Sequence, residues 1–135
     1  MNNSLLMMTT TTSNSILSNG TIPLNTITRR RSNTITSNNN SILLNRVGYY
    51  KVNASVTFNS TATGVATIKA QKNGVDLTGM TASTTITTAT TEFRTLNISG
   101  IVRVTCGEGF GTLTLVNSGI AITTNNVEID VEYLG

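Results

Sequence analysis

The side chains that most often carry out chemistry in proteins are scarce in this sequence of 135 residues. It has no His, so the commonest general base and metal ligand is absent. Its single cysteine, Cys106, excludes an internal disulfide and a cysteine-rich zinc site. Because Cys106 continues an alternation of apolar residues and has no His to activate it, we expect it to be a small core residue.

A pair of carboxylates is the remaining arrangement that could support catalysis. Three of the six acidic residues, Glu128, Asp130 and Glu132, alternate close to the end of the sequence. On a strand, a spacing of two residues places neighbouring carboxylates about 6–7 Å apart, as in some glycosidases. These three would lie on an exposed face, and no residues around them predict a pocket. We therefore expect no enzymatic activity, no cofactor and no metal.

The charge balance does not favour nucleic acid or membrane as a partner. The net charge is only +3, and the three Tyr and three Phe do not interleave with the basic residues as base-stacking surfaces require. The apolar run from Leu5 to Met8 is too short for a signal-peptide core or a membrane span.

The composition is typical of an all-β protein. The sequence has 27 Thr and 17 Asn, whereas only 11% of its residues are charged. Thr is β-branched and suits a half-exposed sheet surface, and Asn suits turns. The length suits one domain with one core.

Alternation of apolar and polar residues with a period of two predicts strands that have one buried face. It is regular over residues 50–58, 66–70, 113–115 and 127–133. Asn73-Gly74 follows the second of these and predicts a hairpin that resumes at Val75. The Thr-rich segment 81–91 is predicted to be an edge strand followed by a loop.

The segment 93–106 is long for one strand, and it breaks the alternation twice. Arg94 has the parity of the apolar residues, and Ile101 has the parity of the polar ones. Gly100 lies beside the second break, so we expect a bulge or bend there that resets the two faces.

Before residue 48 the alternation is looser, but segments 9–17, 22–31 and 35–44 each contain a short predicted strand. Eight to ten strands at fairly even spacing indicate a two-sheet sandwich or a jelly roll. We expect residues 11–135 to form this domain. Residues 1–10 would be an N-terminal arm or the lead-in to the first strand.

Several short motifs occur in a recognisable order. Arg29-Arg30-Arg31 is followed by an Asn-rich turn, by Gly48-Tyr49-Tyr50 and by Asn73-Gly74, and a segment from Ile101 to Cys106 precedes the last strand. In this order they resemble short phage and prophage proteins with a tumour-necrosis-factor-like jelly roll, which are related to the globular tips of exosporium collagen-like proteins. The resemblance covers residues 9–134, and it implies a homotrimer of two-sheet jelly rolls.

The resemblance also implies where the subunits meet, because in such trimers the outer face of one sheet packs near the three-fold axis. We expect the interface residues to be Tyr49, Lys51, Arg103, Glu128, Asp130, Glu132 and Leu134. Opposite charges across strands or subunits would relieve the repulsion among the three acidic residues. The alternative is a solvated, charged face that prevents edge-to-edge aggregation.

These features predict a non-enzymatic structural protein of a bacteriophage particle, a trimeric auxiliary (decoration) protein on the capsid exterior. It would be made in the host cytoplasm and would reside on the outer surface of the virion. Multivalency would turn weak single contacts into firm attachment. The alternative is the receptor-binding tip of a head or tail fibre, although the sequence has no collagen-like or coiled-coil shaft.

The expected partners are further copies of the chain, the major capsid protein or neighbouring virion proteins, with a host cell-surface glycan as a further candidate. The candidate contacts with a capsid or partner protein are Leu5, Leu6, Met7, Met8 and Arg30. The apolar residues among them could instead form an ordinary buried first strand. Arg30 would point away from Arg29 and Arg31, so at least one of the three is expected to have a partner inside the trimer.

Overall fold

The computed structural model describes residues 4–108 and 110–135, which form eleven β-strands. In chain order they are β1 (Leu5–Thr10), β2 (Asn14–Ile16), β3 (Thr26–Arg31), β4 (Ile35–Asn38), β5 (Ser41–Leu44), β6 (Gly48–Asn59), β7 (Gly64–Lys72), β8 (Val75–Ile86), β9 (Arg94–Val104), β10 (Gly111–Asn117) and β11 (Ile122–Tyr133). In these residues no helix is long and apolar enough to cross a membrane.

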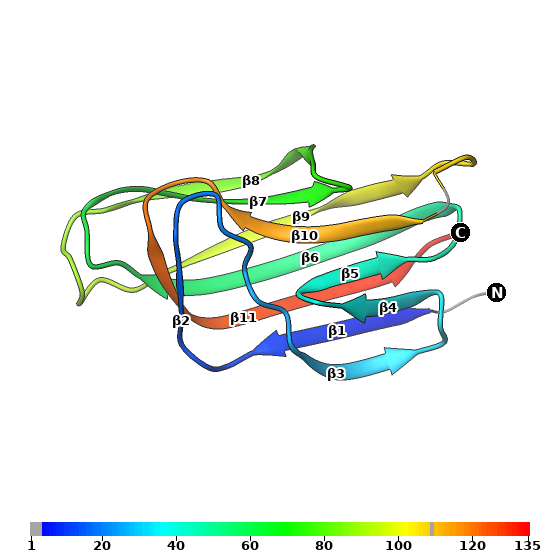
Figure 1. Cartoon of the computed structure of the whole chain (residues 1–135), viewed down its shortest axis with the longest axis horizontal. Coiled ribbons are helices and arrows are strands. Elements are labelled where there is room, and N and C mark those ends of the chain that lie inside the picture. The colour runs from blue at the N-terminus through cyan, green and yellow to red at the C-terminus, as the bar shows by residue number, and fades with distance from the viewer. Residues whose placement is uncertain (1–3, 109) are drawn as a thin grey trace.

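The strands form two antiparallel sheets packed face to face (Figure 1). Sheet A has the order β3-β1-β11-β6-β9, with β2 also paired to β11, and sheet B has the order β4-β5-β10-β7-β8. From β5 to β11 nearly every connection crosses from one sheet to the other, and only the β7–β8 hairpin stays within a sheet. This is the predicted all-β, two-sheet jelly roll.

The core lies between the two sheets and is filled by the inward residues of each strand. In β6 and β11 the burial alternates as the sequence predicts, and the three acidic residues of β11 point outward. Two buried tyrosines, Tyr50 and Tyr133, close one end of the core with ring centroids 5.0 Å apart. The Tyr50 hydroxyl donates to the Arg46 carbonyl at 2.6 Å, and the Tyr133 hydroxyl donates to the Val47 carbonyl at 2.7 Å. Burial raises the pKa of Tyr50 above its usual value.

Residues Leu5–Thr10 form β1, the first strand of sheet A. Leu6 and Met8 are buried in the core, because β1 pairs with β11 on one side and with β3 on the other. Their predicted role as contacts with a capsid protein is therefore wrong, and the alternative of a buried first strand holds. Leu5 and Met7 alternate with them on the opposite face and stay partly exposed. Residues 1–3 of the predicted arm lie outside the described residues.

The bulge expected at Gly100 is absent. The pairing of β9 with β6 continues without a register shift from Arg94 to Val104. Ile101 therefore keeps the outward direction that its parity dictates, and 57% of its surface is exposed. Gly100 lies over Met80 of sheet B instead, where a Cβ atom would come within 2.9 Å of the Met80 side chain.

The prediction that Cys106 is a core residue is wrong, because its side chain is exposed. Strand β9 ends at Val104, and the chain turns at the next residues. The alternation of apolar and polar residues in the sequence thus continues for two residues after the strand has ended.

The hairpin predicted at Asn73-Gly74 is confirmed. Both residues have positive φ, 53° and 80° respectively, as a two-residue hairpin turn requires. Strand β8 is the edge strand predicted from the Thr-rich segment, and it is followed by a loop.

Two glycines give a matched test of the packing between elements. A Cβ atom at Gly119 would lie 2.5 Å from the Val65 carbonyl oxygen, which belongs to backbone, whereas one at Gly100 would meet only the flexible Met80 side chain. We expect Gly119→Ala to lower the free energy of unfolding by about 3 kcal/mol and Gly100→Ala by about 1 kcal/mol. Urea unfolding of both variants measures the difference, and equal losses would contradict this packing.

Candidate functional site on the outer face of sheet A

The outer face of sheet A is the face turned away from sheet B, and strand register places its residues in rows. One row contains Arg31, Leu5, Glu132, Lys51 and Ile101. The next outward row contains Arg29, Met7, Asp130, Asn53 and Ser99. A further row contains Thr9, Glu128, Ser55 and Asn97.

The structure brings all seven predicted interface residues to this face or its border. Tyr49 lies opposite Arg103, whose guanidinium carbon is 5.5 Å from the centre of the Tyr49 ring. Leu134 follows β11 directly, and its N–H donates to the Tyr49 carbonyl at 2.8 Å. Tyr49 and Leu134 are both exposed, and together with Ile101 they give this end of the face an apolar surface.

Ile101 is the residue of this surface that the sequence interpretation missed. Ile101 occupies one of the positions of β9 that otherwise carry polar residues, and this could have identified it as an exposed apolar residue. An apolar residue at an outward position marks an exposed apolar patch as readily as it marks a bulge.

The acidic residues of β11 have no charged partner in the described part of the chain. The three ion pairs found there join Lys69 to Asp76, Lys72 to Glu108 and Arg94 to Glu92. Half of the acidic residues are thus neutralised within the chain, and the other half stand in one line on the outer face of sheet A.

Asp130 is the centre of this line. Its Oδ1 atom is inaccessible to solvent and has no hydrogen-bond partner among the described residues. A buried acceptor without a partner costs about 1–3 kcal/mol, so a group that bonds to it would stabilise the protein. Shallow grooves of about 370 and 310 Å³ lie beside Asp130, and both are also lined by Asn53.

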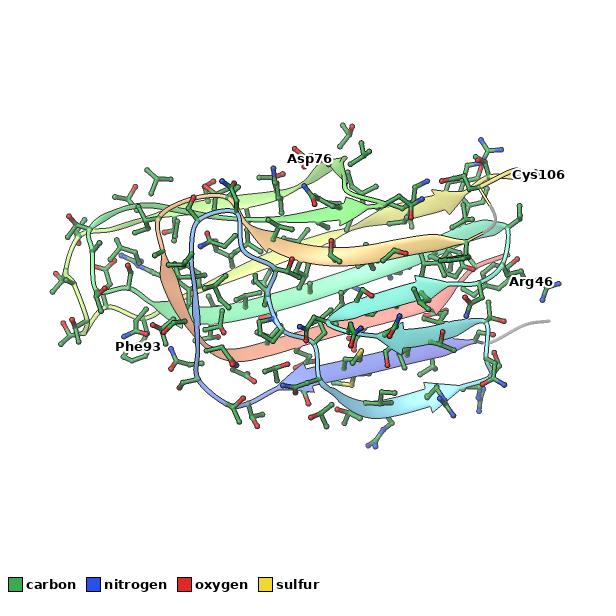
Figure 2. All side chains as sticks on the ribbon, in the orientation of Figure 1. Arg46, Asp76, Phe93 and Cys106 are labelled. Atoms are coloured by element: carbon green, nitrogen blue, oxygen red, sulfur yellow. The ribbon has the colours of Figure 1, made fainter. Side chains whose placement is uncertain are left out.

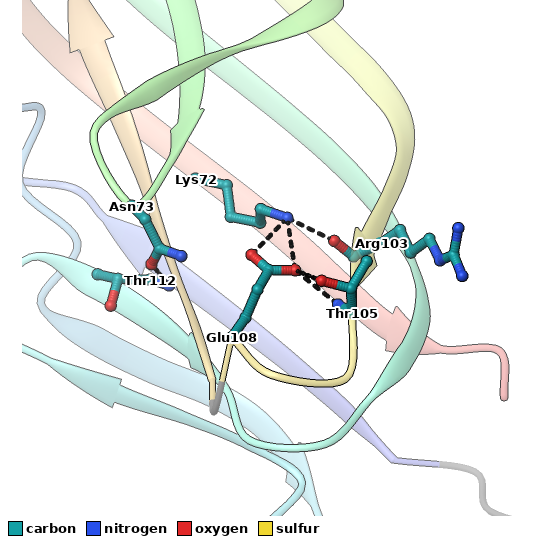
Figure 3. Close-up of polar contacts among 6 residues, drawn as sticks. All are labelled: Lys72, Asn73, Arg103, Thr105, Glu108 and Thr112. Atoms are coloured by element: carbon teal, nitrogen blue, oxygen red, sulfur yellow. Dashed lines mark hydrogen bonds and ion pairs between the residues drawn. The ribbon is translucent and has the colours of Figure 1, made fainter.

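A polar clamp fixes the end of β9 and the turn that follows it (Figure 3). The Glu108 carboxylate accepts from the Thr105 N–H and hydroxyl, both at 2.6 Å, and pairs with the Lys72 ammonium at 2.9 Å. The same ammonium donates to the Arg103 carbonyl at 2.6 Å. Since Lys72 belongs to sheet B and Arg103 to sheet A, the clamp joins the two sheets and holds the backbone of Arg103 in place.

The clamp also explains the acidity of Glu108. The hydrogen bonds from Thr105, followed by that from Lys72, lower the pKa of Glu108 to about 2 from 4.5. At the opposite end of the sandwich, the Thr87 hydroxyl and Arg94 lower the pKa of Glu92 to about 2 in the same way.

Arg29, Arg30 and Arg31 lie on β3, which is an edge strand and is exposed along its whole length. None of the three makes an ion pair with a described residue of the chain. Of the predicted contacts with other proteins, Arg30 is therefore accessible at this edge, and Leu5 and Met7 are partly accessible on the outer face.

The outer face is suited to binding another protein surface. It combines apolar side chains, charges of both signs and shallow grooves, and its strands hold these groups on rigid backbone. The described residues include no group of three His, Cys, Asp or Glu side chains that could hold a metal ion.

Comparison with solved structures defines the class of fold. The crystal structure of murine APRIL at pH 5.0 superposes with a TM-score of 0.72 at 13% identity, covering 98% of this chain and 100% of that one. Eiger TNF from S. frugiperda has a TM-score of 0.68 at 10% identity, with 98% and 92% covered. PRD1 vertex protein P5 has a TM-score of 0.63 at 16% identity, with 98% and 97% covered.

At these identities the likeness shows the fold, which is a tumour-necrosis-factor-like jelly roll, as the sequence predicts. No family model and no curated protein matches the sequence. The phage origin and the relation to exosporium proteins stay predictions.

The acidity of Glu108 gives a test of the clamp. A carboxyl group whose pKa is lowered by folding stabilises the protein above pH 4.5, and this stabilisation is lost as the pH falls towards 2. We expect the free energy of unfolding of Glu108→Gln to be lower at neutral pH and to decline less between pH 4.5 and 2. Urea unfolding at several pH values measures both. Glu92→Gln should show the same change independently, and parallel pH profiles for Glu108→Gln and the unaltered protein would contradict the clamp.

Proposed function

We propose that the protein is a non-enzymatic structural component of a bacteriophage particle, and that it acts as a homotrimer. The likeness to PRD1 vertex protein P5, which extends over nearly all of both chains, supports a particle component. The observation that carries the proposal is the outer face of sheet A, where charges of both signs that make no ion pair with a described residue lie beside exposed apolar side chains.

This face has the composition of a contact between subunits. In a ring of three copies each subunit offers two different surfaces, one to each neighbour. The apolar end at Tyr49, Ile101 and Leu134 would supply the buried centre of the contact. The acidic line of β11 would meet cations of the next copy, and a guanidinium or amide group inserted into a groove would satisfy Asp130.

As a structural component, the protein would act through geometry. A trimer repeats every weak contact three times, so the attachment of the whole is much firmer than that of one subunit. We place it on the outer surface of the virion as an auxiliary (decoration) protein, in contact with the major capsid protein or its neighbours. The alternative is a fibre tip that binds a host cell-surface glycan.

Two exposed β-branched residues test the subunit contact. Ile101 on the outer face of sheet A and Val65 on β7 of sheet B are 57% and 52% exposed. We expect the unaltered protein to have the mass of three chains in light scattering. Ile101→Asp should raise the dissociation constant at least about thirtyfold, because it places a charge in an apolar contact beside an acidic line. Val65→Asp is the control and should stay trimeric. The proposed interface is wrong if the unaltered protein is a monomer, or if the two variants dissociate to the same extent.

Counting the protein in purified particles tests its role. A decoration protein should be present in many copies, in a multiple of three, when particles are analysed by quantitative mass spectrometry. A few copies per particle would instead indicate a fibre tip. Its absence from particles, or hydrolysis of cell-wall or capsular sugar by the purified protein, would overturn the proposal.

A further inference from the structure

The cations that make no ion pair in the described residues gather towards one end of the sandwich. We call it the termini end, because the Ser4 carbonyl accepts from the Tyr133 N–H there and the Gly135 carbonyl accepts from the Tyr49 N–H. The C-terminus lies at this end (Figure 1), and so do Arg46 and Cys106, whereas Phe93 lies at the opposite end (Figure 2).

Strand register places the other unpaired cations in the same half of the molecule. Arg103 lies beside Tyr49 at the end of sheet A, and the adjoining row of that face contains Arg31 and Lys51. Arg30 and Arg29 follow along β3. At the opposite end of the described structure Glu92 and Arg94 neutralise one another at 2.9 Å. The basic character of the protein is thus concentrated towards its termini end.

Apolar side chains are exposed between these cations. Val47 and Phe110 belong to two different segments at the termini end, outside the proposed subunit contact, and each is about half exposed. The Val47 segment is tied to β11, because the Tyr133 hydroxyl donates to the Val47 carbonyl at 2.7 Å. A partner that binds beside Val47 would therefore lose little free energy to ordering of that segment.

We propose that the termini end binds an acidic protein surface. An apolar centre with a charged rim is the usual anatomy of a protein interface, and guanidinium groups pair with carboxylates in a fixed two-bond geometry. A nucleic-acid site would need a continuous line of cations with several rings on which successive bases stack. Of the described rings at this end, Tyr49 is covered by Arg103 and Tyr133 is buried, which leaves Phe110 as a single exposed ring.

This inference rests on the proposed function, since it names the end by which the particle component attaches. Cyclic symmetry points equivalent ends of the three copies the same way along the axis. A trimer would therefore present the termini end three times on one side and would leave the loops at the Phe93 end pointing away from the shell.

The test measures the binding of the full chain to immobilised poly-L-glutamate at low salt. The variant Arg30→Gln with Arg46→Gln removes two cations from the termini end, outside the proposed subunit contact. The matched control, Lys69→Gln with Arg94→Gln, removes two cations that are paired elsewhere and leaves the same net charge. We expect the first to weaken binding about tenfold and the control to change it little.

The single variant Arg30→Gln guards against a loss of folding, because Arg46 also lies over the Tyr133 ring at 5.5 Å. It should weaken binding about threefold, with an unchanged melting temperature. The inference is wrong if the control loses as much affinity for poly-L-glutamate as the first variant. It is also wrong if the protein binds duplex DNA or phosphatidylglycerol vesicles more tightly than poly-L-glutamate. Light scattering separates the two proposals. If the protein is trimeric and binds poly-L-glutamate equally well without these arginines, only the inference about the termini end is refuted. If the protein is monomeric and its binding still requires the arginines, only the proposed trimer is refuted.

Discussion

The pleat of sheet A is the constraint on which the rest of this structure depends. Side chains alternate between its two faces, so the commitment of Leu6, Val52 and Ile129 to the core also decides what lies outside. The same alternation places the acidic line, the apolar end, Arg29 and Arg31 on one rigid surface. A slip of one residue in β11 would bury three carboxylates and expose the core, and this cost fixes the register.

The regular strands could be predicted from the sequence because each contains its own alternation and turn signals. Predictions were wrong where local pattern and tertiary context disagree. Cys106 has the parity of the core, but the strand ends before it. Ile101 occupies an outward position of β9, and no bulge turns it into the core. Leu6 and Met8 are core residues, since a strand far away in sequence pairs with them.

The charges of the candidate site could be predicted only in part. The line on β11 follows from spacing alone, and its outward direction is confirmed. The clamp joins Lys72 to Glu108 across 36 positions, and no local pattern indicates such a pair. The concentration of unpaired cations towards one end depends on which ends of β3, β6 and β9 lie together. The topology supplies this information, and the sequence pattern does not.

The place of β11 in sheet A also has a consequence for the synthesis of the protein. This strand is the last of the eleven described strands and yet lies between β1 and β6, at the centre of its sheet. Until it emerges from the ribosome, those two strands lack the partner that joins them, and their facing edges are open. The sandwich can therefore close only after β11 has been synthesised, so folding is dominated by pairing between distant segments and should be slow for a fold of this size.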